Sequence, residues 1–378
     1  MADYCPEKIL EYVRSGLIEQ EHFGFFVKIA SDGTVFKVGD DKNYPFYLRS
    51  CAKPLQASLL IDFGLDKFYD MTGKEIAICC ASHAGEPCHV ETVKGFLDKA
   101  GINENLLKCG FHKPLSKTEQ NKLLLSGEKE NVLQNNCSGK HAMMLAVCKK
   151  MGWGINDYDN PEHPLQTAIR KKIYELCEIP PTPTLPLKGG GSKTPTSNFM
   201  AKKTNNMGAS FCSSPSPLEG EGWGGGFSPL NYPTTRDGCG VPIYAMPLKN
   251  MVKGYLNLFL DKKYLKIRDA FVQNPYLIGG EDRLDTAIMK ANRNLISKVG
   301  AGGLCIVVNL KKREGLVIKI MDCDMKARAI ALIEALKQLG WLNETMLESD
   351  LIKAQNPKDI LTLHGEKIGE ANPTFKFA

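Results

Sequence analysis

A glycine- and proline-rich segment in the middle of the chain most constrains how it can fold. Residues 181–229 contain 9 glycines and 7 prolines, and phrases such as LPLKGGG and SPSPLEGEGWGGGFSPL have neither helical nor strand periodicity. Such a composition buries too little apolar surface to offset the entropy lost on ordering. We therefore predict a disordered insertion here, similar in look to translated repeat elements. We interpret it as a passenger, and a binding role is the alternative.

The remaining composition is that of a globular protein with a full core. The 378 residues are 43% hydrophobic and 24% charged, and a net charge of +6 with dispersed basic residues predicts no nucleic-acid partner. No apolar run reaches the roughly 18 residues of a membrane span, and MADYCPEKILEYVRSGLIEQ lacks the apolar core of a signal peptide. The 13 cysteines include no C-x-x-C pair, so we expect reduced thiols and a cytoplasmic location.

Hydrophobic periodicity predicts strands mixed with long helices, which indicates an α/β or α+β protein. We expect two strands within 23–38, a buried strand at 75–83 that ends in a loop at Ser82, and strands at 298–310 and 315–322. The predicted helices lie within 49–63, 89–101, 138–152, 161–178 and 323–341.

A serine and a lysine three residues apart open the first predicted helix. In RSCAK (49–53), the i,i+3 spacing places the Ser50 hydroxyl and the Lys53 amine on one helical face. A lysine whose pKa is lowered by burial or nearby positive charge can deprotonate the serine and activate it as a nucleophile. S-x-x-K also occurs in serine β-lactamases and penicillin-binding proteins. The alternative is a solvated surface pair, but the apolar face of the helix favours the functional interpretation.

A second polar cluster, ASHAGEP (81–87), follows the predicted buried strand. Catalytic side chains are displayed at such positions in α/β folds. On its own, the cluster is also compatible with an ordinary turn in which Ser82 or His83 caps the next helix.

Two cysteines lie among small residues far apart in the chain. Cys137, in NNCSGKH (135–141), precedes a predicted helix, whose N-terminus lowers a thiol's pKa and suits a nucleophile or a metal ligand. Cys239 lies in the turn RDGCGVP (236–242). Two such cysteines can share one zinc ion, although the spacing alone makes this only one possibility.

These motifs, taken in order, resemble the bacterial L-asparaginase II family, the zinc-containing group typified by the Rhizobium etli thermolabile enzyme. They cover nearly everything between residues 17 and 335 except the insertion, and eight matches in sequence order are specific. The matching residues are Glu19 with His22 and Gly24, Arg49-Ser50-x-x-Lys53, Ser82-His83-x-Gly85-Glu86, Asn136-Cys137-Ser138-Gly139-Lys140-His141, His163-Pro164-Leu165-Gln166, Asp237-Gly238-Cys239-x-x-Pro242, Arg283-x-Asp285-Thr286 and Ser297-Lys298-x-Gly300-Ala301.

The resemblance implies an α/β (α+β) fold similar to serine β-lactamases and glutaminases, with a sheet flanked by helices. It implies one catalytic domain made of residues 1–180 and 230–345, interrupted by the insertion at 181–229 and followed by a C-terminal extension at 346–378. It also implies a homodimer.

The resemblance implies a reaction as well, the hydrolysis of L-asparagine to L-aspartate and ammonia. Ser50, deprotonated by Lys53, would attack the amide, and Ser82 with Lys298 would relay a proton to the leaving ammonia. One zinc ion per chain would position the substrate's α-amino or carboxylate group, although a lysine ligand must be neutral to bind it. The implied residues are Ser50, Lys53, Ser82 and Lys298 for catalysis, Arg49, His83, Glu86 and Asp237 for substrate binding, and Cys137, Lys140 and Cys239 for zinc.

Two positions depart from the family pattern. Gly302 stands where the family usually has glutamate, and Gln20 stands where it usually has serine. We expect reduced activity if that glutamate orients the distant lysine. The alternatives are an acyl hydrolase acting on glutamine, a peptide or a β-lactam, and a zinc-binding or interaction protein without activity. The retained serines and lysines argue against the last alternative.

Overall fold

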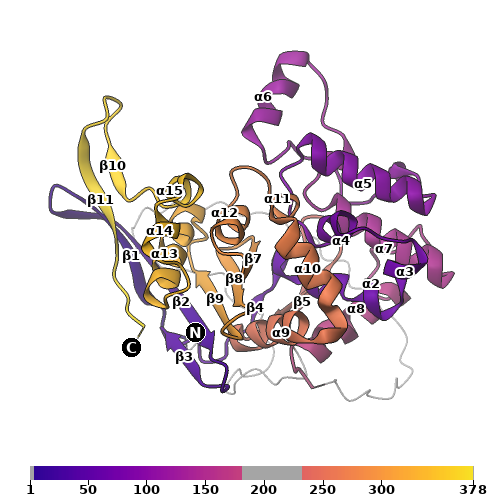
Figure 1. The fold of residues 1–378 in the computed structure, drawn as a ribbon, viewed down its shortest axis with the longest axis horizontal. Helices are drawn as coiled ribbons and strands as arrows, with labels where there is room; N and C mark the ends of the chain where they lie inside the picture. Colours follow the sequence, from indigo (N-terminus) through magenta and orange to yellow (C-terminus); the bar gives the residue numbers. More distant parts are fainter. Residues whose placement is uncertain (1–3, 181–231, 378) are drawn as a thin grey trace, which may run out of the picture.

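A large antiparallel sheet with helices on both faces organises the molecule (Figure 1). The computed structural model describes residues 4–180 and 232–377, so the insertion predicted at 181–229 lies outside the described residues. The described strands of this sheet run in the order β10-β11-β1-β2-β9-β8-β7, and β3 pairs with the C-terminal half of β2. The mixed α/β class predicted from periodicity is confirmed.

The strands are short except for β2, which pairs with β1 along its first half and with β3 and β9 along its second. A small second sheet has the order β4-β6-β5. The strands are β1 (Glu7–Arg14), β2 (Leu17–Ile29), β3 (Val35–Val38), β4 (Phe46–Tyr47), β5 (Thr234–Arg236), β6 (Pro242–Met246), β7 (Leu295–Gly300), β8 (Leu304–Asn309), β9 (Glu314–Ile320), β10 (Asp359–Leu361) and β11 (Lys367–Pro373).

Most of the helices lie on one face of the sheet and form a lobe with its own core. They are α1 (Ala52–Ala57), α2 (Leu59–Asp62), α3 (Leu65–Phe68), α4 (Gly73–Cys80), α5 (Pro87–Ala100), α6 (Lys117–Ser126), α7 (Ser138–Met151), α8 (Pro164–Leu176), α9 (Leu248–Leu260), α10 (Leu265–Gln273) and α11 (Pro275–Ile278). Nearer the C-terminus follow α12 (Leu284–Ala291), α13 (Met325–Gln338), α14 (Glu344–Leu347) and α15 (Asp350–Gln355). Single 3₁₀ turns are η1 (Arg49–Cys51), η2 (Glu104–Leu106), η3 (Val132–Gln134) and η5 (Lys262–Tyr264).

Both faces of the sheet are buried, because successive side chains of a strand point to opposite sides. On β8, Leu304 and Ile306 join the core under the large helical lobe, whereas Cys305 and Val307 join the core under α12, α13 and α15. This alternation places β7 and β8 between the two helical layers, where side chains at the end of β7 reach the lobe.

Most of the predicted elements are confirmed. The β2–β3 hairpin pairs Ile29 with Val35, and α8 begins with Pro164 at its first turn. Helices α5 and α7 end where Gly101 and Gly152 adopt the left-handed conformation that glycine allows, with φ of 61° and 68°.

The strand predicted at 75–83 is wrong, because residues 75–80 form most of helix α4, although Ser82 does lie in a loop as expected. Its start is capped reciprocally: the Thr72 hydroxyl accepts from the Glu75 N–H, and the Glu75 carboxylate accepts from the Thr72 N–H at 2.7 Å. The residues that follow, 76–80, are all buried. A segment buried on every side has no periodicity that distinguishes a helix from a strand.

The single strand predicted at 298–310 is also wrong, because the chain turns back within it. Gly302 and Gly303 both adopt φ of 73° and separate β7 from β8, which pair from Gly300 with Leu304 onward. A Cβ at Gly302 would meet no atom within 4 Å, so the strain on a side chain here would come from the backbone alone.

The last residues of the described chain belong to the sheet. Strand β11 pairs with β1 in antiparallel register, and Phe375 packs on Phe26 with ring centroids 4.6 Å apart. These residues lie within 346–378, the segment expected to form a C-terminal extension. Across residues 4–180 and 232–377, the cysteines are free thiols, and no helix has the length and apolarity to cross a membrane.

Candidate active site

The predicted catalytic residues meet where η1, the end of α4 and the edge of β7 come together. Ser50 lies in η1 and Lys53 in α1, while Ser82 lies in the loop after α4 and Lys298 on β7. Arg49, just before Ser50, has φ of 49°, a conformation that few non-glycine residues adopt and that is often found at functional sites.

Lys53 is buried and its amine is surrounded by oxygen atoms. Its Nζ lies 2.8 Å from the Ala81 carbonyl, 2.9 Å from Ser82 Oγ and 2.9 Å from the Asn136 carbonyl. Burial lowers the pKa of Lys53, and this effect outweighs the opposing influence of Cys137. A lysine with a lowered pKa beside a serine hydroxyl can serve as a general base.

The structure pairs Lys53 with Ser82, whereas the sequence spacing predicts a pair with Ser50. Ser82 is buried, and its N–H donates to the Ile278 carbonyl at 3.0 Å. Ser50 is half-buried, and its hydroxyl makes no hydrogen bond with residues 4–180 or 232–377. Ser50 is thus the serine that a substrate can approach, and Ser82 is the one already bonded to the lysine.

Lys298 pairs with a carboxylate and forms no hydrogen bond to Ser82 within the described chain. Its Nζ lies 3.4 Å from Asp285 Oδ2 and 3.0 Å from the Val299 carbonyl. Asp285 also accepts from Ser297 Oγ at 2.8 Å and from the Val299 N–H at 3.1 Å. Because Asp285 and Lys298 are both fully buried, the carboxylate and the ammonium neutralise each other in the core.

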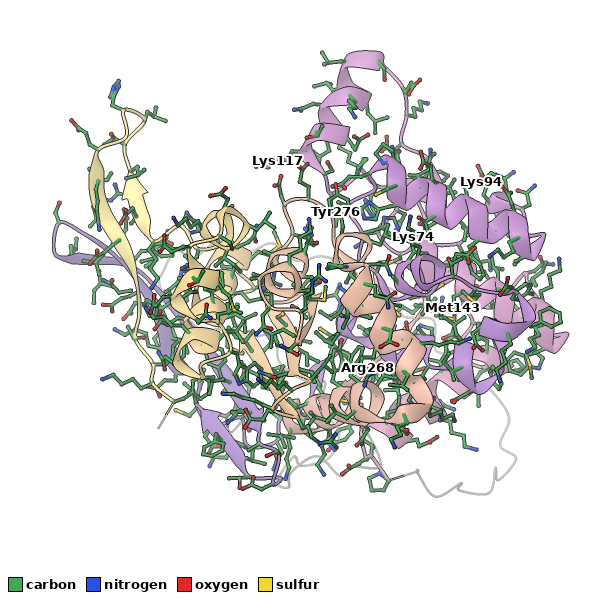
Figure 2. The ribbon with its side chains drawn as sticks, viewed as in Figure 1. Lys74, Lys94, Lys117, Met143, Arg268 and Tyr276 are labelled. Atoms are coloured by element: carbon green, nitrogen blue, oxygen red, sulfur yellow. The ribbon has the colours of Figure 1, made fainter. Side chains whose placement is uncertain are left out.

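His83 is buried and held in one tautomer. Its Nδ1 accepts from the Gly85 N–H at 3.2 Å, so its Nε2–H donates to Ser138 Oγ at 3.0 Å. Burial and the neighbouring His89 lower the pKa of His83 well below its usual value, which keeps the ring neutral. The His83 ring stacks on His89, and His89 stacks on Tyr276 of α11, where the helical lobe meets the sheet (Figure 2).

The three predicted metal ligands lie side by side at the start of α7 and in the β5–β6 turn. Lys140 Nζ lies 2.8 Å from Cys239 Sγ, and Cys137 is hydrogen-bonded to Cys239. The Cys239 thiol donates to Cys137, which lowers the pKa of Cys137 well below its usual value and raises that of Cys239. Burial lowers the pKa of Lys140, but the charges of the two cysteines raise it by more.

Asp237 connects this group to the start of η1. Its carboxylate accepts from Arg49 Nε at 2.8 Å, and the Gly238 N–H donates to the same oxygen at 3.0 Å. Burial raises the pKa of Asp237, but the positive charges of Lys140 and Arg49 lower it below its usual value. The ion pair therefore joins the two segments that carry Ser50 and Cys239.

The chain matches a known protein family along most of its length. The model of L-asparaginase II matches residues 10–214 and 226–373. The chain belongs to this family. A search of curated proteins found no match. The family assigned from the eight motifs is confirmed, and membership makes the chain an asparaginase-type amidohydrolase that acts on a small molecule.

The residues that the asparaginase II resemblance assigns to zinc fit that metal by their chemistry. Two sulfur atoms and an amine nitrogen converge from α7 and the β5–β6 turn, and zinc prefers sulfur and nitrogen donors. Because the two cysteines raise the pKa of Lys140, zinc would have to displace a proton from this lysine on binding. A different group with metal-ligating side chains lies at the start of α5. The ligand atoms of Glu86, Cys88 and His89 all lie within 4.8 Å of one another.

Sequence reasoning assigned no role to three groups that hold the asparaginase site together. They are the Asp285 carboxylate beside Lys298, the Asn136 carbonyl beside Lys53, and the Ser138 hydroxyl beside His83. Asp285 was recognisable in principle, because a lysine on a strand that is otherwise mostly apolar needs a buried counter-charge. The other two contacts join segments more than fifty residues apart and leave no signal in the local sequence.

Proposed function

We propose that the chain hydrolyses the side-chain amide of L-asparagine to L-aspartate and ammonia through a serine acyl-enzyme. The observation that carries this proposal is the buried Lys53 amine 2.9 Å from Ser82, three residues along the chain from Ser50, in a chain of the asparaginase II family. A sheet covered on both faces, with the S-x-x-K helix against it, supports the expected likeness to serine β-lactamases.

Ser50 is the nucleophile in this proposal, because its hydroxyl is accessible and has no competing bond within the described chain. As Ser50 Oγ attacks the amide carbon, Lys53 in its neutral form accepts the hydroxyl proton. Lys53 then passes a proton through the Ser82 hydroxyl to the leaving nitrogen, and the C–N bond breaks to give ammonia. Water hydrolyses the ester by the same proton route in reverse and restores Ser50.

Two other charged groups support the reaction. Lys298, fixed by Asp285, holds β7 against the turn that carries Ser50, because its carbonyl accepts from Cys51 Sγ at 3.1 Å. Arg49, tied to Asp237, fixes the backbone from which Ser50 projects. His83 orients the loop after Ser82 through its bonds to Gly85 and Ser138.

The proposal includes one zinc ion per chain, which Cys137, Lys140 and Cys239 would hold. Once bound, it would supply a Lewis acid for a polar group of the substrate near Lys53. The zinc-containing type, the catalytic domain at 1–180 and 230–345, the cytoplasmic location and the homodimer stay predictions from the sequence.

Ammonia release from L-asparagine by Ser50→Ala and Ser82→Ala proteins tests the mechanism. We expect turnover to fall about 1,000-fold or more in each, because both act in the same proton route. Only the Ser82→Ala protein should still form an acyl-enzyme in rapid quench and intact mass measurements. The exposed Ser126→Ala protein is the matched control and should retain full activity.

Near-wild-type turnover in the Ser50→Ala protein would contradict the assignment of the nucleophile. Faster ammonia release from L-glutamine than from L-asparagine would instead support the glutaminase alternative.

A further inference from the structure

Arg283, just before α12, is a cation without a partner. Its guanidinium makes no ion pair or hydrogen bond with residues 4–180 or 232–377, although the residue is half-buried. Burial lowers its pKa, because the surrounding protein disfavours the charged form. A desolvated and unpaired guanidinium is costly, and arginine binds carboxylates through two parallel hydrogen bonds. The residue is therefore placed to receive an anion.

The loop that carries Arg283 runs along the catalytic loop. The Ser82 N–H donates to the Ile278 carbonyl at 3.0 Å, which joins the two loops. The Arg283 side chain packs on Gly279, where an added Cβ would lie 2.8 Å from Arg283 Cβ. Residues 279–283 thus follow directly from the point where the backbone touches Ser82.

Three charged residues lie near Arg283. The three whose charges act on its pKa are Asp285, Arg328 and Glu86. Asp285 is already bonded to Lys298 and its neighbours, and Arg328 donates to the Gly300 carbonyl at the end of β7 at 3.1 Å. Glu86 lies against the same stretch of chain, because an added Cβ at Gly280, the residue after Gly279, would lie 2.9 Å from Glu86 Oε1.

Glu86 carries the opposite charge, and one of its two carboxylate oxygens has no hydrogen-bond partner among the described residues. Its Oε1 accepts from the Glu281 N–H at 3.2 Å, whereas its Oε2 is buried and has no hydrogen-bond partner among the described residues. Oε2 lies 3.8 Å from His89 Nδ1, but that nitrogen already accepts from the Glu86 N–H and has no proton to offer. Burial raises the pKa of Tyr276, and a hydrogen bond that its hydroxyl donates to the Glu86 carboxylate raises it further.

We propose that Arg283 binds the α-carboxylate and Glu86 the α-ammonium group of the amino-acid substrate. The two side chains form no ion pair with each other, so their free positions are available to a ligand that carries both charges. An α-amino acid carries them on one carbon atom, and its side-chain amide then extends toward the serines. The inference rests on the proposed function and deepens it, because this arrangement selects free asparagine over asparagine within a peptide.

Truncated substrates separate the two contacts. Removing the α-carboxylate of L-asparagine leaves 3-aminopropanamide, and removing the α-amino group leaves succinamate. For Arg283→Gln, we expect kcat/KM for L-asparagine to fall about 100-fold, mainly through KM, with no change for 3-aminopropanamide. For Glu86→Gln, we expect a similar loss for L-asparagine and no change for succinamate. Arg283→Lys should recover part of the loss.

The matched control is Arg293→Gln, the same substitution at an exposed arginine just beyond α12, which should change no rate. Equal losses of the Arg283→Gln protein on all three substrates would overturn the inference and move the head group to the Cys137, Lys140 and Cys239 cluster. If the wild-type protein binds added zinc and Glu86→Gln removes that binding, the Glu86 position is a metal site, and the assignment of Glu86 to the α-ammonium group is overturned.

Calorimetric binding to the Ser50→Ala protein distinguishes failure of this inference from failure of the proposed function. If the wild type releases no ammonia but the Ser50→Ala protein binds L-asparagine, and Arg283→Gln removes that binding while leaving 3-aminopropanamide unaffected, the head-group site stands without the reaction. If L-asparagine does not bind, or binds equally well after Arg283→Gln, the inference fails even where turnover is seen.

Discussion

At the scale of single residues, buried charges in matched positions define the site. Lys298 and Asp285 have no contact with water, so each ionised group depends on the other. Lys53 pairs with no carboxylate among the described residues: two backbone carbonyls and the Ser82 hydroxyl accept from its amine, and Cys137 also lies beside it. The two lysines are therefore suited to different tasks, because Lys298 is fixed in an ion pair, whereas burial lowers the pKa of Lys53 and favours its neutral form.

The Lys298–Asp285 pair predicts a large effect on stability when one partner is removed. Asp285→Asn leaves Lys298 buried without its counter-charge, and the free energy of unfolding should fall by about 3–5 kcal/mol. Urea unfolding at neutral pH measures this change. The double variant Asp285→Asn with Lys298→Met should recover much of the loss, because it removes the orphaned charge as well.

A Lys298→Met protein as unstable as Asp285→Asn, with no recovery in the double variant, would contradict this prediction. That result would show that Asp285 acts through its bonds to Ser297 and Val299, which the double variant does not restore.

At the scale of elements, the close contact of α4 with α7 assembles the two halves of the site. Helix α4 ends at the loop that carries Ser82, and α7 begins directly after Cys137 and carries Lys140 in its first turn. Gly139 makes the approach possible, because a Cβ at this position would lie 2.2 Å from the Ile78 carbonyl oxygen. No backbone can yield that much space without moving one helix away from the other.

Gly139→Ala should therefore destabilise the protein by about 3 kcal/mol, although alanine favours helices over glycine. It should also reduce turnover, because the displaced α7 would move Cys137 away from Lys53. Gly95→Ala on the exposed face of α5 is the matched control, with no atom within 4 Å of the added Cβ. That change should stabilise the protein by about 0.5–1 kcal/mol. Chemical denaturation of both proteins checks the pair, and a harmless Gly139→Ala would refute the packing argument.

At the scale of the whole molecule, stability should depend on pH through three buried histidines. Burial is the main cause that lowers the pKa of His83, His89 and His141, so all three are neutral in the folded chain. In the unfolded chain, histidine titrates near pH 6.5. Below that pH, the unfolded chain binds protons that the folded chain excludes, so stability is full above about pH 6.5 and falls as the pH decreases.

Each neutral histidine contributes at most about 1.4 kcal/mol of lost stability per pH unit below pH 6.5. His89→Gln should reduce the slope of the unfolding free energy between pH 6.5 and 5.5 by up to this amount, whatever it costs at pH 7.5. Urea unfolding at several pH values measures both slopes. Equal slopes in the two proteins would mean that His89 is protonated in the folded state.

The amino-acid sequence alone determined the class of the protein and most of its helices. Local signals are sufficient there, because a helix end such as Gly101 or Gly152 depends on residues within one turn of the chain. The order of the motifs likewise identified the family without coordinates. The same local signals failed at 75–83, because a helix that is buried on every side carries no period.

Only the tertiary structure decided which groups touch. Sequence spacing pairs Lys53 with Ser50, three residues away, whereas the fold places Lys53 against Ser82 and Lys298 against Asp285. It also leaves Arg283 unpaired beside the catalytic loop. These contacts depend on how α4, α7, α12 and β7 pack, and packing is decided by the shape and volume of the whole core. No property of a short stretch of residues contains that information.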